Sequence, residues 1–291
     1  MLHPSTIQLL RFHFSFFLLP VFLFALSQSP FVNWKNAVFV FLILHLLVYP
    51  SSNGYNSYMD KDETPIGGLK KPLLPTKELF YTTMIMDIAA IVFSTFINGL
   101  FALGILLYIL ASRAYSYRRI RLKRYPVIGF LTVFIFQGAL IFFSTYRAVY
   151  SKQNLHVPVL PCIISSFLIG ALYPLTQIYQ HLEDKQDGVI SISYLLGKKG
   201  TFIFSMLLFL SATFLLYLRF KQVGELNHFY WYLLIMMPVV LFFLYWMMKV
   251  WRNEKAANFR NSLWMNVLST VCTTIFFITL ILAKHWAKLS P

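Results

Sequence analysis

Charged residues are scarce in this sequence. Asp, Glu, Lys and Arg together make up 12% of its 291 residues, whereas soluble globular domains carry about 25%. Hydrophobic residues make up 58% and aromatic residues 18%. This balance excludes an ordinary soluble domain and indicates an integral membrane protein.

Acidic residues are the scarcer of the two charged kinds. Ten Asp and Glu stand against 25 Lys and Arg, which gives a formal charge of +15. In a soluble chain this excess would suggest nucleic acid, but here the basic residues lie in short connections between apolar runs. In that position they set membrane topology and contact anionic lipid. We therefore expect membrane lipid as a partner and no nucleic acid.

Cysteine is almost absent. Cys162 and Cys272 both lie inside apolar segments and show no spacing typical of metal ligands. They are interpreted as small buried hydrophobic residues, and no disulfide framework is implied.

Long apolar runs are what the sequence does contain. Runs of about 17 to 25 apolar residues predict membrane-spanning helices, and so an all-α integral membrane protein. The first run could instead be a signal peptide, since "ALSQS" offers small residues at a cleavage point, but its charged region is poor. The nine predicted spans are residues 10–28, 33–51, 79–95, 97–114, 126–146, 158–180, 199–219, 229–250 and 262–283.

The distribution of charge predicts the orientation. Nine spans place the termini on opposite sides, and the connections on the N-terminal side hold 18 of the 25 Lys and Arg. By the positive-inside rule this side is cytoplasmic, which in a bacterium means the inner face of the inner membrane. Eight of the ten acidic residues lie on the same side. We therefore expect the charge chemistry of the protein there.

Two segments of the sequence are similar. "YPSSNGYNSYMDKDE" covers residues 49–63 and "YPLTQIYQHLEDKQD" covers residues 173–187. Five positions are identical, and two asparagines in the first segment match two glutamines in the second. The repeat predicts one domain, residues 1–291, built from two pseudo-repeated helical halves.

Each repeated segment would present amides and a carboxylate on one helical face. Positions i, i+3 and i+7 of a helix lie within about 60° of one another. The residues at these positions are Asn53, Asn56 and Asp60 in the first segment, and Gln177, Gln180 and Asp184 in the second. If the faces meet, they offer the oxygen ligands that Mg²⁺ prefers, with room for substrate phosphate.

Basic residues follow the first segment and fill the connection before residue 126. They are Lys70, Lys71, Arg118, Arg119, Arg121, Lys123 and Arg124. A metal site beside such cations is the outline of a diphosphate site. The alternative is that the polar residues cap helix ends and the basic run anchors a loop.

These features resemble the UbiA superfamily of intramembrane prenyltransferases over nearly the whole chain. "NSYMDKDE" resembles the first Asp-rich motif of that family, and "LKKP" the basic residue and proline that follow it. "YSYRRIRLKRYP" is similar to the segment between helices four and five, and "EDKQDGVISISYLLGKKG" to the second motif. The resemblance implies nine helices around a central cavity, with both motifs on cytoplasmic loops.

The two motifs depart from the family pattern. Thr64 stands where the first motif usually carries another Asp, so Asp62 or Glu63 would have to serve. In the second motif, Gln177 and Gln180 stand where at least one Asp is expected, and Asp184 remains. Fewer carboxylates would weaken metal binding.

The resemblance implies Mg²⁺-dependent transfer of a prenyl group from an isoprenoid diphosphate to a lipid-soluble, aromatic or quinone-type acceptor. Catalytic roles are expected for Asp60, Asp184 and Lys71, the last neutralising the leaving diphosphate. The expected metal ligands are Asp60, Asp62, Glu63, Asp184 and Asp187. The expected substrate-binding residues are Tyr55, Asn56, Lys70, Arg121, Lys123, Tyr179 and Gln180.

Two other functions fit the same pattern. A terpene cyclase of this family would capture the allylic cation internally, and a transporter would use paired polar segments in two repeats. Asp87 lies inside a span, where it is either functional or paired within the bundle. His181 could be a base beside the second motif or a solvated neighbour. Donor chain length, acceptor identity and oligomeric state are left open.

Overall fold

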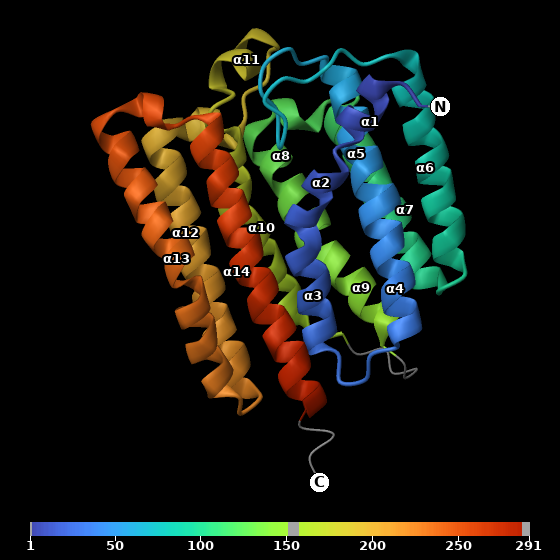
Figure 1. Ribbon diagram of the computed structural model, residues 1–291, viewed down its shortest axis with the longest axis vertical. Helices are drawn as coiled ribbons and strands as arrows, with labels where there is room; N and C mark the ends of the chain where they lie inside the picture. Colours follow the sequence, from blue (N-terminus) through green and yellow to red (C-terminus); the bar gives the residue numbers. More distant parts are fainter. Residues whose placement is uncertain (1, 151–156, 287–291) are drawn as a thin grey trace.

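The computed structural model describes residues 2–150 and 157–286, and the regular secondary structure in these ranges is helical apart from two isolated β-bridges. Nine helical segments in the described part of the chain are long and apolar enough to span a membrane, which confirms the predicted number. Figure 1 shows them as a bundle with α1 (Pro4–Leu10) at one end of the molecule and the last turn of α14 (Phe259–Trp286) at the other. The odd number of spans explains this separation.

Six of the nine spans are single helices. These are α6 (Lys77–Thr95), α7 (Gly99–Ser116), α10 (Val159–Gln177), α12 (Ile192–Gln222), α13 (Leu226–Arg252) and α14 (Phe259–Trp286). The remaining three spans are interrupted. The first contains α1 (Pro4–Leu10), α2 (Phe12–Ser15), η1 (Phe16–Leu18) and α3 (Leu19–Gln28); the second contains α4 (Trp34–Leu42), η2 (Ile43–Val48) and α5 (Tyr49–Asp60); the fifth contains α8 (Pro126–Val133), η4 (Phe134–Leu140) and α9 (Ile141–Val149).

The second span extends nine residues beyond the predicted end at residue 51, to Asp60. The segment is polar, yet its side chains find partners on neighbouring helices. Ser52 shares a hydrogen bond with Ser112 of α7 at 2.6 Å, and the Asn56 amide donates to the Ser116 hydroxyl at 3.0 Å. Because these bonds satisfy its polar groups, the helix continues where hydropathy alone predicts a loop.

The second repeated segment does not form the continuous helix that was predicted. α10 ends at Gln177, and the backbone N–H of Gln180 donates to the Gln177 carbonyl at 2.9 Å in a tight turn. A short helix, α11 (His181–Gln186), then begins. The turn redirects the chain, so the predicted helical face is replaced by two elements at an angle.

Asp87 is paired within the bundle. The residue is 6% exposed, and its carboxylate accepts hydrogen bonds from Arg113 Nε at 2.7 Å and from the Ser51 hydroxyl at 2.6 Å. The Arg113 guanidinium also lies over the Tyr55 ring, 3.9 Å from its centroid. This network joins α5, α6 and α7. It favours the structural reading of this intramembrane charge over a catalytic one.

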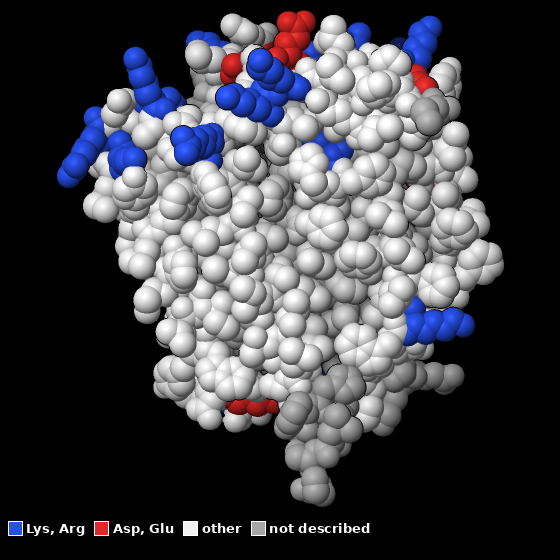
Figure 2. All heavy atoms as spheres, viewed as in Figure 1, with Lys and Arg blue, Asp and Glu red and all other residues white. Residues whose placement is uncertain are grey.

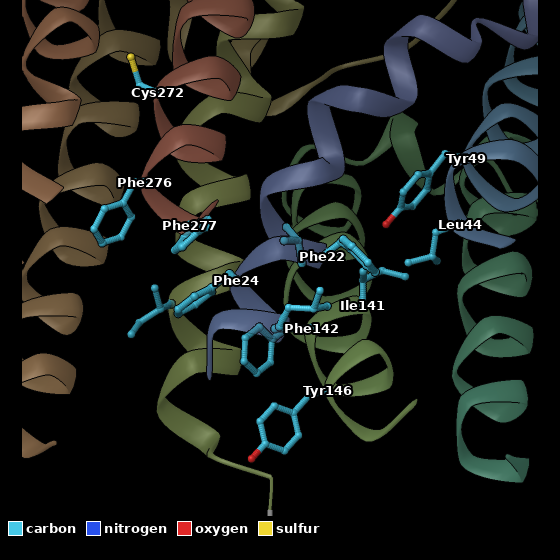
Figure 3. Packing of buried hydrophobic residues seen from close by; sticks show 14 of the residues in the cluster. Phe22, Phe24, Leu44, Tyr49, Ile141, Phe142, Tyr146, Cys272, Phe276 and Phe277 are labelled. Atoms are coloured by element: carbon cyan, nitrogen blue, oxygen red, sulfur yellow. The ribbon is translucent and has the colours of Figure 1, made fainter. Parts of the chain in front are cut away.

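Aromatic packing joins the first, fifth and last spans. Phe24 of α3 stacks on Phe277 of α14 with ring centroids 4.7 Å apart, and it contacts Phe142 of α9 at 5.1 Å. Figure 3 shows these rings in the interior of the bundle. α3 therefore lies between two groups of helices, α4 to α7 with α9 on one side and α12 to α14 on the other (Figure 1).

Charged side chains gather at one end of the molecule. Figure 2 shows basic and acidic residues concentrated above a broad uncharged band, at the end where α1 and α11 lie in Figure 1. The uncharged band is the surface expected to face lipid. The protein is therefore a multi-pass integral membrane protein, with one end that is rich in charge.

Candidate functional site

A polar cavity of about 200 Å³ opens at the charged end of the bundle. Its walls come from α2, α5, α7, η4, α10 and α11, together with the connections that follow α5 and α7. The residues that carry its polar surface are Arg11, Ser52, Asn53, Asn56, Asp60, Asp62, Ser112, Tyr115, Lys123, Gln137, Tyr173, Gln177, Gln180, Glu183, Asp184 and Asp187. We call this space the polar cavity.

The first repeated segment places its three predicted residues in the polar cavity. Asn53, Asn56 and Asp60 lie on one face of α5 and all three line it. Asp60 is the last helical residue, and Lys61 ends the helix in a left-handed conformation with φ of 57°. The Asp60 side chain is only 4% exposed, so its charge depends on protein partners.

The second segment reaches the same cavity in spite of its broken helix. Gln177, Gln180 and Asp184 all line it. The Gln180 amide donates to the Pro65 carbonyl at 3.3 Å, which ties this turn to the connection that follows α5. Gln177 donates to the Tyr173 hydroxyl at 2.9 Å. The fold thus brings together two polar segments that lie far apart in the sequence.

The basic connection between α7 and α8 crosses between the two segments. The Lys123 ammonium pairs with Asp60 Oδ2. Arg121 pairs with the Asp187 carboxylate, donates to the Asp187 carbonyl at 2.9 Å, and lies 3.5 Å from Asp60 Oδ1. Arg118 makes a longer contact with Asp187, at 3.4 Å, from an exposed position. Two cations therefore sit against the carboxylates of both segments.

Several buried polar atoms of the polar cavity have no hydrogen-bond partner. The acceptors are Asp60 Oδ1, Gln177 Oε1 and Glu183 Oε2, and Arg11 Nε is a donor of the same kind. An unpartnered buried polar group costs about 1–3 kcal/mol, so these atoms fit ligands better than they fit an apolar core. Carboxylate and amide oxygens without a hydrogen bond suit a hard cation, and the free Nε–H of Arg11 suits an anion. Asp60 Oδ1 has only the 3.5 Å ion pair with Arg121.

No three His, Cys, Asp or Glu side chains in the described ranges converge closely enough to form a metal site by themselves. Mg²⁺ usually binds through one or two carboxylates and completes its shell with water and phosphate oxygens. The side chains present therefore fit Mg²⁺ held jointly with a phosphate-bearing ligand. They do not fit a cation held by protein alone.

Burial and mutual repulsion shift two carboxyl groups of the polar cavity toward the neutral form. Burial, reinforced by Asp60, raises the pKa of Asp62 to about 6. Burial raises the pKa of Asp184 to about 7, although the Lys123 charge opposes this. A bound cation would favour the ionised form of both groups.

Several predicted residues lie elsewhere. Glu63, Lys70 and Lys71 are exposed and do not line the polar cavity. Tyr55 is buried beneath Arg113, and Tyr179 packs edge-on against Phe259 with centroids 5.4 Å apart. Glu63, Lys70, Lys71 and Tyr55 are therefore not brought into the polar cavity. Tyr179 is not part of its lining either, although its hydroxyl lies close enough to Arg11 and Asp184 to interact with their charges.

Arg11 is the main cavity residue that the sequence analysis did not single out. It adopts a left-handed conformation between α1 and α2, with φ of 48°, and is 5% exposed. Its guanidinium donates to the Gly67 carbonyl at 3.0 Å and the Asn53 carbonyl at 3.2 Å. The sequence did contain a signal for Arg11, because it interrupts the first apolar run. A charged side chain in a membrane-spanning segment costs free energy and is usually functional.

Two tyrosines were also missed. The hydroxyls of Tyr115 and Tyr173 contact each other where α7 meets α10, and both residues line the polar cavity. Glu183, which the sequence analysis did not single out either, also lines this cavity. Both tyrosines lie in segments that the sequence analysis quoted, since Tyr173 begins the second repeated segment and Tyr115 begins "YSYRRIRLKRYP", but neither was distinguished from the other tyrosines there.

The model of the UbiA prenyltransferase family matches residues 16–284, which is most of the chain. The protein therefore belongs to the UbiA prenyltransferase family and is a membrane prenyltransferase. No curated protein sequence matches it.

Solved structures share the fold at low sequence identity. A UbiA homolog from Archaeoglobus fulgidus bound to DMAPP and Mg²⁺ is 18% identical with a TM-score of 0.70, over 95% of this chain and 99% of that one. A UbiA homolog from Aeropyrum pernix K1 is 18% identical with a TM-score of 0.64, over 90% and 97%. A digeranylgeranylglyceryl phosphate synthase is 19% identical with a TM-score of 0.60, over 96% and 97%. At this identity the likeness concerns the fold.

Proposed function

We propose that this prenyltransferase uses Mg²⁺ to transfer a prenyl group from an isoprenoid diphosphate to a lipid-soluble, aromatic or quinone-type acceptor. The observation that carries the proposal is the set of unpartnered acceptor oxygens and the unpartnered Arg11 donor that share one cavity. Two structures of the Archaeoglobus fulgidus homolog, one bound to DMAPP and Mg²⁺ and the other to GPP and Mg²⁺, support the same kinds of ligand here.

Asp60 and Asp184 are proposed as the principal metal ligands, one from each repeated segment. Bound Mg²⁺ would neutralise charge on the diphosphate as it leaves. Asp62 lines the same cavity and is the nearest substitute for the family Asp that Thr64 replaces. Asp187 also lines it, but its charge is engaged by Arg121. Glu63 is the weakest candidate because it is exposed.

Lys123 and Arg11 are proposed to bind the diphosphate. Both line the polar cavity, and the Lys123 side chain is 12% exposed, so solvent screens its charge little. Positive groups fixed where negative charge develops stabilise the transition state without rearrangement. Arg121 supports them by holding Asp187 and the turn around it. The exposed positions of Lys70 and Lys71 favour Lys123 for the role first expected of Lys71.

Loss of diphosphate leaves an allylic cation that needs protection from water. Tyr115, Tyr173 and Phe136 line the cavity and present aromatic rings, each of which can stabilise a nearby cation by about 0.5–2 kcal/mol. We propose these rings for that role in place of Tyr55 and Tyr179. Asn56 and Gln180 remain proposed substrate-binding residues since both line the cavity.

We further propose that the charged end faces the cytoplasm and that the single domain consists of two pseudo-repeated halves. The excess of Lys and Arg at that end supports the orientation. The matching contributions of α5 and of α10 with α11 to one cavity support the repeat.

The test is a transfer assay on purified protein. Farnesyl, geranylgeranyl and longer diphosphates are supplied with Mg²⁺, with and without a quinone-type acceptor, while pyrophosphate and prenylated product are measured. Acceptor-dependent release, lost on chelation with EDTA, supports the proposal. Release with an internally cyclised product would indicate the cyclase, and no release with any donor would contradict the proposal.

A further inference from the structure

A second cavity, of about 370 Å³, lies on the other side of α10. It is enclosed by α3, α10, α12, α13 and α14, and apolar side chains make up most of its lining. None of the residues that line it also lines the polar cavity. We call it the apolar cavity.

α10 separates the two cavities. Tyr173 and Gln177 face the polar cavity, whereas Ala171, Leu172 and Leu175 line the apolar one. A molecule in the apolar cavity is therefore screened from Asp60 and Lys123 by a helix. Its role is distinct from that of the prenyl donor in the polar cavity.

The apolar cavity reaches the surface that faces lipid. Four of its lining residues, Leu210 on α12 and Leu233, Val240 and Leu244 on α13, are each at least 37% exposed. The last three recur along one side of α13. This stripe marks an edge of the cavity where hydrocarbon from the bilayer can enter. An apolar cavity does not hold water, and hydrocarbon supplies the contacts that its walls otherwise lack.

One polar group in the apolar cavity is unusual. Serine and threonine in a helix commonly donate to the carbonyl four residues earlier, and Ser165 does so, to Pro161 at 3.0 Å. Ser205 lines the cavity, is 1% exposed, and its hydroxyl has no hydrogen-bond partner. A buried hydroxyl in this state fits a ligand that carries one oxygen among apolar atoms.

We propose that the apolar cavity binds one hydrocarbon chain of a membrane lipid, with a hydroxyl or carbonyl oxygen of the lipid hydrogen-bonded to Ser205. The chain enters between α12 and α13 and lies against α10. Because α10 also carries Gln177 and Tyr173, an occupied cavity supports the wall of the polar cavity from behind. This site does not depend on the proposed substrates of the enzyme.

The proposal is tested by measuring the unfolding temperature of purified protein with single-chain probes. Farnesol represents isoprenoid chains and oleyl alcohol acyl chains, and farnesane is a hydrocarbon without oxygen. We expect one or both alcohols to raise the unfolding temperature by at least about 2 °C, and farnesane to raise it less. A response to farnesol alone assigns an isoprenoid chain, and a response to oleyl alcohol alone an acyl chain.

Three variants locate the effect. Ser205→Ala should remove the advantage of the alcohols over farnesane, and Ala171→Phe, which fills the cavity, should abolish all shifts. Ile163→Phe is the matched control, since Ile163 lies on α10, is 41% exposed and does not line the cavity. Asp60→Asn should keep the full shift, which separates this site from the polar cavity. Equal shifts in Ala171→Phe and wild type would overturn the proposal.

A second measurement covers the case in which Ala171→Phe does not fold. A farnesol analogue that carries a diazirine is photo-crosslinked to wild-type protein, and the labelled residues are identified by mass spectrometry. Labels on Met206 or Met236, which line the cavity, support the proposal. Labels confined to positions that face lipid outside it, such as Leu234 at 66% exposure, overturn it.

Discussion

Lys71 and Lys123 carry the same charge but lie in different surroundings. Lys71 is exposed, and its backbone carbonyl accepts a hydrogen bond from the Gln8 amide at 3.3 Å. Lys123 is buried against Asp60 in the polar cavity. Charge near solvent is screened, whereas charge in a buried site is not. The two residues therefore offer a direct test of which cation acts on the diphosphate.

We expect Lys123→Met to lower turnover by about 100-fold, the scale of losing one electrostatic stabiliser. Lys71→Met should stay within about fivefold of wild type, as expected for an exposed charge. Pyrophosphate release at saturating donor measures both. A large loss in Lys71→Met with little in Lys123→Met would reverse the assignment.

The buried pair of Asp87 and Arg113 leads to a second prediction. Removing one partner of a buried ion pair leaves an uncompensated charge and destabilises by about 3–5 kcal/mol. We expect Asp87→Asn to leave the Arg113 guanidinium unpaired and to lower the yield of folded protein strongly. The double variant Asp87→Asn with Arg113→Met removes both charges and should recover part of the loss. Size-exclusion chromatography in detergent and the unfolding temperature measure both effects, and a fully stable Asp87→Asn would contradict this role.

At the level of elements, the polar cavity depends on two segments that meet only in the folded protein. Asp60 ends α5, and Asp184 lies on α11 beyond the turn that follows α10. If both hold one metal, the loss of either removes most of the same stabilisation, and the second loss adds little.

We therefore expect Asp60→Asn and Asp184→Asn each to lower turnover by at least about two orders of magnitude. The fold-reduction in turnover of the double variant should be far smaller than the product of the fold-reductions of the two single variants. Glu63→Gln is the control, because Glu63 is an exposed carboxylate of the same segment. Fully multiplicative losses would indicate that the two segments form separate sites.

The packing of α11 on α12 carries a pH dependence. His181 shares a hydrogen bond with the Ser193 hydroxyl at 2.8 Å and contacts the Tyr194 ring edge-on. Burial, with a smaller contribution from Lys198, lowers the pKa of His181 to about 4 from its usual 6.5. These contacts assign the histidine a structural role in place of the base or solvated neighbour first considered.

Because the folded protein disfavours protonated His181, the unfolded chain binds more protons between pH 6.5 and 4. The stability that His181 contributes is present above about pH 6.5 and is lost as the pH falls toward 4. Hydrogen exchange of the α11 amides, corrected for intrinsic rates, should accelerate over this range. His181→Phe should weaken this dependence, and unchanged protection of α11 at pH 4.5 would contradict it.

At the level of the whole molecule, the charged end should face the cytoplasm. Cysteines placed at the exposed positions Glu63 and Lys185, in a background without Cys162 and Cys272, should react with a membrane-impermeant maleimide only from the cytoplasmic side. A cysteine at Gln222, at the opposite end of the bundle, should react only from outside. Labelling of residues 63 and 185 from different sides would exclude a shared site.

The spans were the most predictable part of the structure. Each needs about 20 apolar residues to cross the hydrocarbon, and that requirement is local, so the number nine follows from the sequence. The ends were less predictable because polar residues such as Asn56 stay helical when neighbouring helices supply partners. The turn at Gln180 could not be predicted, because residues 177–181 include no proline or glycine that would end a helix.

The membrane environment, the helical class and the repeat that marks Asp60 and Asp184 could all be predicted from the sequence. Each depends on composition or on the spacing of residues along one chain. Three features required the folded structure: the cations that lie beside those carboxylates, the pairing of Asp87 with Arg113, and the second cavity behind α10. Burial and pairing depend on residues brought together from distant parts of the chain. The local sequence around Lys123 therefore does not predict that its loop packs against Asp60.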